Sequence, residues 1–251
     1  MIEIFALSII QGITEFLPIS SSSHLILMSE FLNFTNKDIS IDISLHIGSF
    51  IAVVFYFNKE IINFYENKIL FLKVFIASLP VMIIGFFLME SNYIEKIRSL
   101  EIIAWTTLIF GILLYISDKF KLENNIKNLN YKSIIFIGLL QIFSLIPGVS
   151  RSGIAITAAR FLKFKRVDAA KISFLISIPI LGAVSIFGLK NIIWSGNAVL
   201  TQLNLIAIIF SFLFSLITIK FFLSFINKFS LNLFILYRIV LGFFLLALNY
   251  L

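Results

Sequence analysis

The sequence predicts an all-α polytopic membrane protein that forms a single integral membrane domain over residues 1–251. Of the 251 residues, 60% are hydrophobic and 13% are charged, and the mean hydropathy is +1.05. Several apolar runs approach the ~20 residues that a helix needs to cross a ~30 Å hydrocarbon core. Because these runs are long and continuous rather than alternating, they favour membrane helices over a membrane β-barrel.

Six apolar spans are continuous, and two longer segments are interrupted. The continuous spans lie near 39–57, 69–89, 101–117, 170–190, 199–224 and 231–251. Residues 2–34 would make one helix of ~50 Å, but Pro18 and four consecutive serines, 20–23, interrupt it. Residues 131–162 are interrupted by the sequence PGVSRSG at 147–153. Each interrupted segment therefore predicts two half-length helices with a polar break, the second helices lying near 22–33 and 153–162.

The two breaks resemble each other, and this predicts an internal repeat. Aligning Pro18 with Pro147 places Ser21 on Ser150, Ser23 on Ser152 and His24 on Gly153. The two halves, about 1–120 and about 130–251, then each contain a re-entrant broken helical hairpin followed by three transmembrane helices. The odd number of spans between the hairpins inverts the second half, which is the plan of an inverted repeat.

The lysines and arginines indicate an orientation. If the second hairpin is re-entrant, four basic residues lie on one face: Lys37, Lys96, Arg98 and Lys190. The other face carries Lys59, Lys68, Lys73, Lys119, Lys121, Lys127, Lys132, Arg160, Lys163, Lys165, Arg166, Lys171, Lys220 and Lys228. The positive-inside rule makes this richer face cytoplasmic and places both termini outside. Arg151 and Arg238 lie within apolar runs, and we expect Arg238 to extend to the interface at the cytoplasmic end of the last helix.

The breaks carry the groups of an anion site. A helix that starts at a break presents free N–H groups and the positive end of its dipole. Serines at such a start can cap the helix or donate hydroxyls to a ligand, and Arg151 supplies a planar fork suited to phosphate oxygens. Ionisable groups at membrane depth are costly and therefore indicate function. The sequence thus predicts a phosphate site inside the membrane that opens to the outer face.

Glu15 and His24 add acid–base chemistry to this site. A serine or a water could attack a phosphorus atom, with His24 or Glu15 as general base. Less specific explanations are a structural Arg151–Glu15 ion pair, serines that only cap helices, and a hydrogen-bonded core histidine. His46 and Asp42, on the next span, are expected to support the site or the fold.

A phosphate site embedded in lipid predicts a substrate with an apolar tail that arrives laterally from the bilayer. A transporter of lipid phosphates is the alternative, because inverted repeats with broken helices and a midplane anion site also occur in transporters. The catalytic set of Glu15 and His24 separates the two, since transport alone would not need it. Nucleic acid is not expected as a partner, because loop lysines in a membrane protein report orientation.

Two motifs carry a resemblance to a known family. QGITEFLPISSSSH at 11–24 and PGVSRSG at 147–153, with the flanking DISLHIGSFIAVVFYF and SFLISIPILGA, closely resemble the undecaprenyl-diphosphate phosphatase family, also called the bacitracin-resistance family. The resemblance implies hydrolysis of undecaprenyl diphosphate to the monophosphate and inorganic phosphate. It also implies a bacterial plasma-membrane location, recycling of the lipid carrier for peptidoglycan, resistance to bacitracin, and a divalent cation, Mg²⁺ or Ca²⁺. A homo-oligomer is compatible with the sequence.

By position, the resemblance makes Glu15, Ser21, His24 and Arg151 catalytic. The residues that it expects to bind substrate are Gln11, Ser20, Ser22, Ser150 and Ser152. Ser21 is the preferred nucleophile, activated by His24, while direct attack by His24 is the alternative. Glu15 is the expected metal ligand or general base.

Three positions depart from the family's pattern. Gln11 stands where glutamate is frequent, and an amide is a weaker ligand for a hard cation than a carboxylate. Ser23 stands where glycine is common. Ala155 stands where threonine is common, and the nearby Thr157 could supply the missing hydroxyl.

Overall fold

The computed structural model describes residues 1–31, 39–90, 97–194 and 202–250. In these ranges the regular structure is helical, apart from one isolated bridge between Asn124 and Phe164. The α-helices are α1 (Ile2–Thr14), α2 (Ser21–Phe31), α3 (Ile39–Tyr56), α4 (Asn58–Ile62), α5 (Phe64–Glu90), α7 (Leu100–Asp118), α8 (Tyr131–Gln141), α9 (Arg151–Phe161), α10 (Arg166–Trp194), α11 (Gln202–Lys228) and α12 (Asn232–Tyr250). Two 3₁₀ turns, η1 (Ile126–Asn128) and η2 (Ile142–Leu145), flank α8.

Five of the six predicted continuous spans are helices long and apolar enough to cross a membrane. They are Glu66–Leu88, Leu100–Asp118, Arg166–Lys190, Gln202–Lys228 and Asn232–Tyr250. The sixth, α3, has 18 residues, and its apolar part Ser40–Tyr56 belongs with the shorter apolar helices. At ~1.5 Å per residue, an α3 of this length reaches about 27 Å, slightly less than a ~30 Å core.

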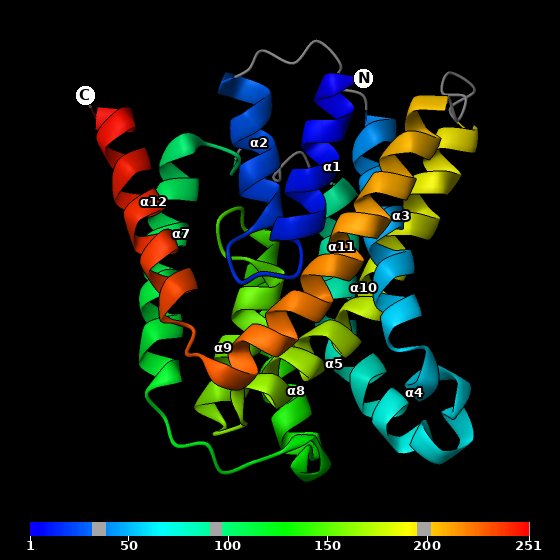
Figure 1. The fold of residues 1–251 in the computed structure, drawn as a ribbon, viewed down its shortest axis with the longest axis vertical. Coiled ribbons are helices and arrows are strands. Elements are labelled where there is room, and N and C mark those ends of the chain that lie inside the picture. Colours follow the sequence, from blue (N-terminus) through cyan, green and yellow to red (C-terminus); the bar gives the residue numbers. More distant parts are fainter. Residues whose placement is uncertain (32–38, 91–96, 195–201, 251) are drawn as a thin grey trace.

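Both interrupted segments are broken where the sequence predicts. Residues 2–31 form the hairpin of α1 and α2, and residues 131–161 form the hairpin of α8 and α9. In Figure 1, α1 and α2 extend inward from the end of the molecule where both termini lie, and α8 and α9 extend inward from the opposite end. The two breaks lie beside each other at mid-height (Figure 1), where the Ser152 hydroxyl donates to the Leu17 carbonyl at 2.8 Å.

The helices after the two breaks begin in the same way. Ser20 and Ser150, the residues before α2 and α9, have positive φ angles of 75° and 72°. This left-handed conformation is costly for residues other than glycine and occurs mostly where function or packing imposes it. The alignment of Pro18 with Pro147 pairs Ser21 with Ser150, but the helix starts pair Ser20 with Ser150. The second break is one residue longer after its proline, so the predicted register is wrong by one residue at the caps.

The extra residue is accommodated by Gly148, which has a φ of +93°. A Cβ atom on Gly148 would lie 1.9 Å from Oγ1 of Thr106, so no side chain fits there. Thr106 in turn donates to the Pro147 carbonyl at 2.6 Å, which fixes the second break against α7. Helix α9 is buried over Ser152–Arg160 and packs against α7, α8 and α10.

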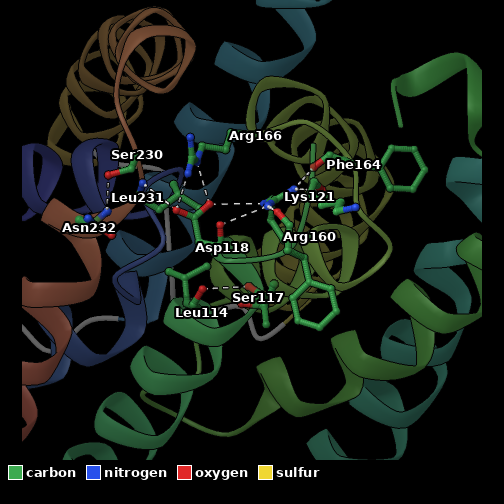
Figure 2. A network of polar contacts seen from close by, with 12 residues as sticks. Leu114, Ser117, Asp118, Lys121, Arg160, Phe164, Arg166, Ser230, Leu231 and Asn232 are labelled. Carbon is green, nitrogen blue, oxygen red and sulfur yellow. Dashed lines mark hydrogen bonds and ion pairs between the residues drawn. The ribbon is translucent and has the colours of Figure 1, made fainter. Parts of the chain in front are cut away.

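A buried ionic network fixes the end of the molecule opposite the termini (Figure 2). Asp118, at the end of α7, accepts from Arg160 Nε at 3.4 Å and from Arg166 Nε at 2.8 Å. The Leu231 amide, before α12, also donates to Asp118, at 3.4 Å. From the sequence we expected both arginines to be surface charges that report orientation, but Arg160 has no exposed surface. Its guanidinium also donates to the carbonyls of Phe120 and Phe164, so this network joins α7, α9, α10 and α12.

Candidate active site

Glu15 is the centre of the polar cluster at the two breaks. It is the C-cap of α1 and is 6% exposed. Its Oε1 accepts from Arg151 Nη2 at 2.9 Å, and its Oε2 accepts from the Ser21 hydroxyl at 2.6 Å. Arg151 and Ser21 are the first residues of α9 and α2. One carboxylate therefore joins the N-termini of the two helices that follow the breaks.

Gln11 and His46 support this carboxylate from the side. Gln11, one helical turn before Glu15, uses Nε2 to donate to Oε2 of Glu15 at 3.0 Å. The same nitrogen lies 3.0 Å from Nδ1 of His46 on α3. Because an amide nitrogen only donates, Nδ1 accepts this hydrogen bond. His46, which we expected to support the site or the fold, thus contacts Gln11, whereas Asp42, on the same helix, is exposed.

Two buried polar atoms of the cluster have no hydrogen-bond partner in the part of the chain that the structure describes. They are Nη1 of Arg151 and Oε1 of Gln11. Leaving such groups unpaired costs about 1–3 kcal/mol each, and more for a charged group. The first is a donor of the kind that binds a phosphate oxygen, and the second is an oxygen of the kind that binds a hard cation.

The remaining predicted serines differ in their placement. Ser150 caps α9, accepting from the Gly153 amide at 3.0 Å, and Ser152 donates to Leu17. Ser20 lies within 3.0 Å of the Ser23 hydroxyl. Ser22 is exposed, and its hydroxyl lies 3.4 Å from that of Ser20. Ser150 and Ser152 thus support the break, whereas Ser21 is the serine that the structure brings to Glu15.

The departures from the family's pattern also have structural outcomes. Thr157 is buried and donates to the Gly153 carbonyl of its own helix at 2.8 Å. Ser23 is buried and bonds Ser20, which ties the start of α2 more tightly than a glycine would.

His24 contacts groups other than Ser21. Its Nδ1 lies 2.6 Å from the Ser20 carbonyl, and its Nε2 lies 2.6 Å from the Tyr237 hydroxyl. We expected His24 to activate Ser21, but both ring nitrogens of His24 contact other groups. Glu15 takes that position, because it accepts the hydrogen bond of Ser21.

Arg238 is the site residue that the sequence placed wrongly. We expected it to reach the interface, but it has no exposed surface. Its guanidinium donates to the carbonyls of Pro18 at 3.2 Å, Gly148 at 2.8 Å and Val149 at 3.0 Å. It also donates to the Thr107 carbonyl of α7 at 3.2 Å. Arg238 therefore holds both breaks together, and its position inside an apolar run was the signal that could have indicated this.

Comparison with known proteins agrees with this arrangement of motifs. The family model described as bacitracin resistance protein BacA matches residues 4–244. An undecaprenyl-diphosphatase of Pelagibacter ubique (strain HTCC1062) is 50% identical over 252 residues, which cover 100% of this chain and 98% of the relative. An undecaprenyl-diphosphatase of Alcanivorax borkumensis is 38% identical over 255 residues, which cover 96% of both chains. With its two breaks joined through Glu15 and Arg151, and with a match over nearly its whole length, the chain belongs to the bacitracin resistance protein BacA family.

Proposed function

We propose that this protein hydrolyses undecaprenyl diphosphate to undecaprenyl phosphate and inorganic phosphate in the bacterial plasma membrane. The observation that carries the proposal is the unpartnered Nη1 of Arg151 beside the Glu15–Ser21 pair, at the start of two helices. The substrate follows from the relatives, two of which are named for this activity. Such an activity would recycle the lipid carrier of cell-wall synthesis and oppose bacitracin.

The terminal phosphate binds between the two helix starts. Nη1 of Arg151 donates to a non-bridging oxygen, and the free amides at the start of α2 and α9 add favourable dipoles. A phosphate that binds Arg151 competes with Glu15 for the guanidinium. Glu15 is then freed from part of its ion pair and can take a proton from Ser21.

Ser21 is the nucleophile that this geometry favours. Its oxygen attacks the terminal phosphorus, forming an Oγ–P bond as the anhydride P–O bond breaks. The bridging oxygen leaves with undecaprenyl phosphate, and the Ser21 proton goes to Glu15, which already accepts its hydrogen bond at 2.6 Å.

His24 serves the second half of the reaction. A water attacks the phosphoserine, the Oγ–P bond breaks, and inorganic phosphate leaves. Nδ1 of His24 faces a carbonyl, which can only accept, so Nδ1 carries the hydrogen and Nε2 is the basic nitrogen. Nε2 takes the proton of the attacking water, and the proton held by Glu15 returns to Ser21.

A divalent cation fits this site only together with the substrate. Among the described residues there is no group of three or more His, Asp, Glu or Cys side chains that could hold a metal. Mg²⁺ is commonly bound by one or two carboxylates with phosphate oxygens and water. Glu15 and the unpartnered Oε1 of Gln11 are oxygen ligands of this kind, and Ca²⁺ would accept them too. When bound, the cation would neutralise charge on the diphosphate.

The two hairpins are re-entrant, and the two halves form an inverted repeat within a single membrane domain. The lysine-rich end is cytoplasmic, both termini are outside, and the site opens to the outer face. The chain contains no cysteine, so single cysteines can test this directly. In intact cells, a membrane-impermeant maleimide should label Arg98→Cys and not Lys127→Cys; the reverse result would overturn the orientation.

Phosphate release from sealed vesicles tests the function itself. Purified wild-type protein should release inorganic phosphate from undecaprenyl diphosphate, and a chelator should stop the release. Movement of the intact lipid across the bilayer without phosphate release would support a transporter instead. The relatives' names do not favour that alternative.

A further inference from the structure

Helix α12 places two successive polar side chains at the breaks. Arg238 binds the carbonyls of Pro18, Gly148 and Val149. Tyr237, its neighbour, lies with its hydroxyl 2.6 Å from Nε2 of His24. Arg238 fixes this turn of α12 to both breaks, and this also holds the neighbouring Tyr237 in place beside His24.

The two hydrogen bonds of His24 define its ring completely. Nδ1 donates to the Ser20 carbonyl at 2.6 Å, so Nε2 has the lone pair and Tyr237 is the donor. The rings of His24 and Tyr237 also stack, with centroids 5.7 Å apart and an angle of 16° between their planes. Both the orientation and the tautomer of the imidazole are thus fixed by neighbours, as a general base requires.

Tyrosines near membrane surfaces often serve only as interfacial anchors, with the ring in lipid and the hydroxyl in water. Tyr237 is 42% exposed, but its hydroxyl is directed to a ring nitrogen. A tyrosine hydroxyl donates one hydrogen and still accepts through its oxygen. It can therefore accept a proton from water while it passes its own proton to Nε2.

We infer that Tyr237 is a catalytic residue: it holds Nε2 of His24 as the basic nitrogen and relays the proton of the attacking water to that nitrogen. In this step the water proton moves to the Tyr237 oxygen as the Tyr237 proton moves to Nε2, so the phenol is neutral before and after. The inference rests on the proposed function, because it assigns the proton of the second hydrolytic step.

Tyr237→Phe tests this inference, since it removes only the hydroxyl and keeps the ring. Turnover should fall about 10-fold, the effect of one neutral hydrogen bond. KM should fall with it, so that kcat/KM and the melting temperature stay unchanged. Phosphoserine at Ser21 should accumulate during turnover, because only the second step is slowed. Tyr115→Phe is the matched control: Tyr115 is 44% exposed, lies in the last turn of α7, and has its ring 4.7 Å from Nζ of Lys119.

A second measurement does not depend on activity. The chain has two histidines, so histidine labelled with ¹⁵N in nanodisc-embedded protein gives two rings, and His24→Gln assigns them. The His24 ring should show a protonated Nδ1 and an unprotonated Nε2, and Tyr237→Phe should shift the Nε2 resonance alone. An unchanged Nε2 resonance, or unchanged turnover, would overturn the inference. If Tyr237→Phe shifts the Nε2 resonance but the wild-type protein has no phosphatase activity, the proposed function is refuted. The contact between Tyr237 and His24 would still stand.

Discussion

Replacing Arg238 by methionine should both destabilise the protein and disrupt its site. Arg238 is fully buried and donates to three carbonyls of the two breaks. These carbonyls lie outside the regular helices and would lose this donor. At about 1–3 kcal/mol for each buried group left unpaired, the loss should be at least about 3 kcal/mol. For a chain of this size, such a loss corresponds to a decrease of about 10 °C in melting temperature.

Thermal unfolding in detergent, read by loss of monodisperse protein, measures this change. Arg98→Met is the matched control, because Arg98 is exposed and should leave the melting temperature within about 2 °C. Phosphate release by Arg238→Met, assayed well below its melting temperature, should also fall, since the two breaks lose their shared donor. A variant as stable and as active as wild type would refute the view that Arg238 holds the breaks together.

Three further predictions concern other parts of the account. Asp118→Asn should destabilise the protein by about 3–5 kcal/mol, because it leaves buried arginine charge without a carboxylate; Glu123→Gln, which removes an exposed ion pair, should cost less than about 1 kcal/mol, and equal effects in thermal unfolding would contradict this. Gln11→Glu should lower the Mg²⁺ concentration needed for half-maximal activity, since a carboxylate binds a hard cation better than an amide; an unchanged titration would exclude Gln11 as a ligand. His24→Gln should increase the fraction of protein carrying phosphate on Ser21 in acid-quenched turnover, and loss of that intermediate would place His24 in the first step instead.

The sequence indicated much of the fold because its signals are local. A proline followed by serines interrupts an apolar run wherever it occurs, so the breaks before α2 and α9 could be located from composition alone. The pairing of Glu15 with Arg151 could be inferred because two costly charges in apolar surroundings have few partners available. What this reasoning could not supply was the register of the second break, which depends on the left-handed Gly148.

The contacts that the sequence missed all join residues far apart in the chain. Arg238 resembled an interfacial arginine because its helix is apolar on both sides, and only the packing of α12 against α7 brings it to the breaks. Arg160 was grouped with the charges of the lysine-rich face because it precedes Lys163 and Lys165 in the sequence, although Asp118 lies close to it in space. Tyr237 carries no local signal, since one tyrosine among many aromatic residues is ordinary in a membrane protein.

The most direct test of the central claim is phosphate release by Arg151→Ala beside wild type and Arg98→Ala, with undecaprenyl diphosphate as substrate. We predict that Arg151→Ala loses at least about 100-fold in kcat/KM, because the donor aimed at the developing charge is gone. Arg98→Ala should keep wild-type activity. Full activity in a folded Arg151→Ala would contradict the account, since the phosphate site would then lie away from the meeting point of the two breaks.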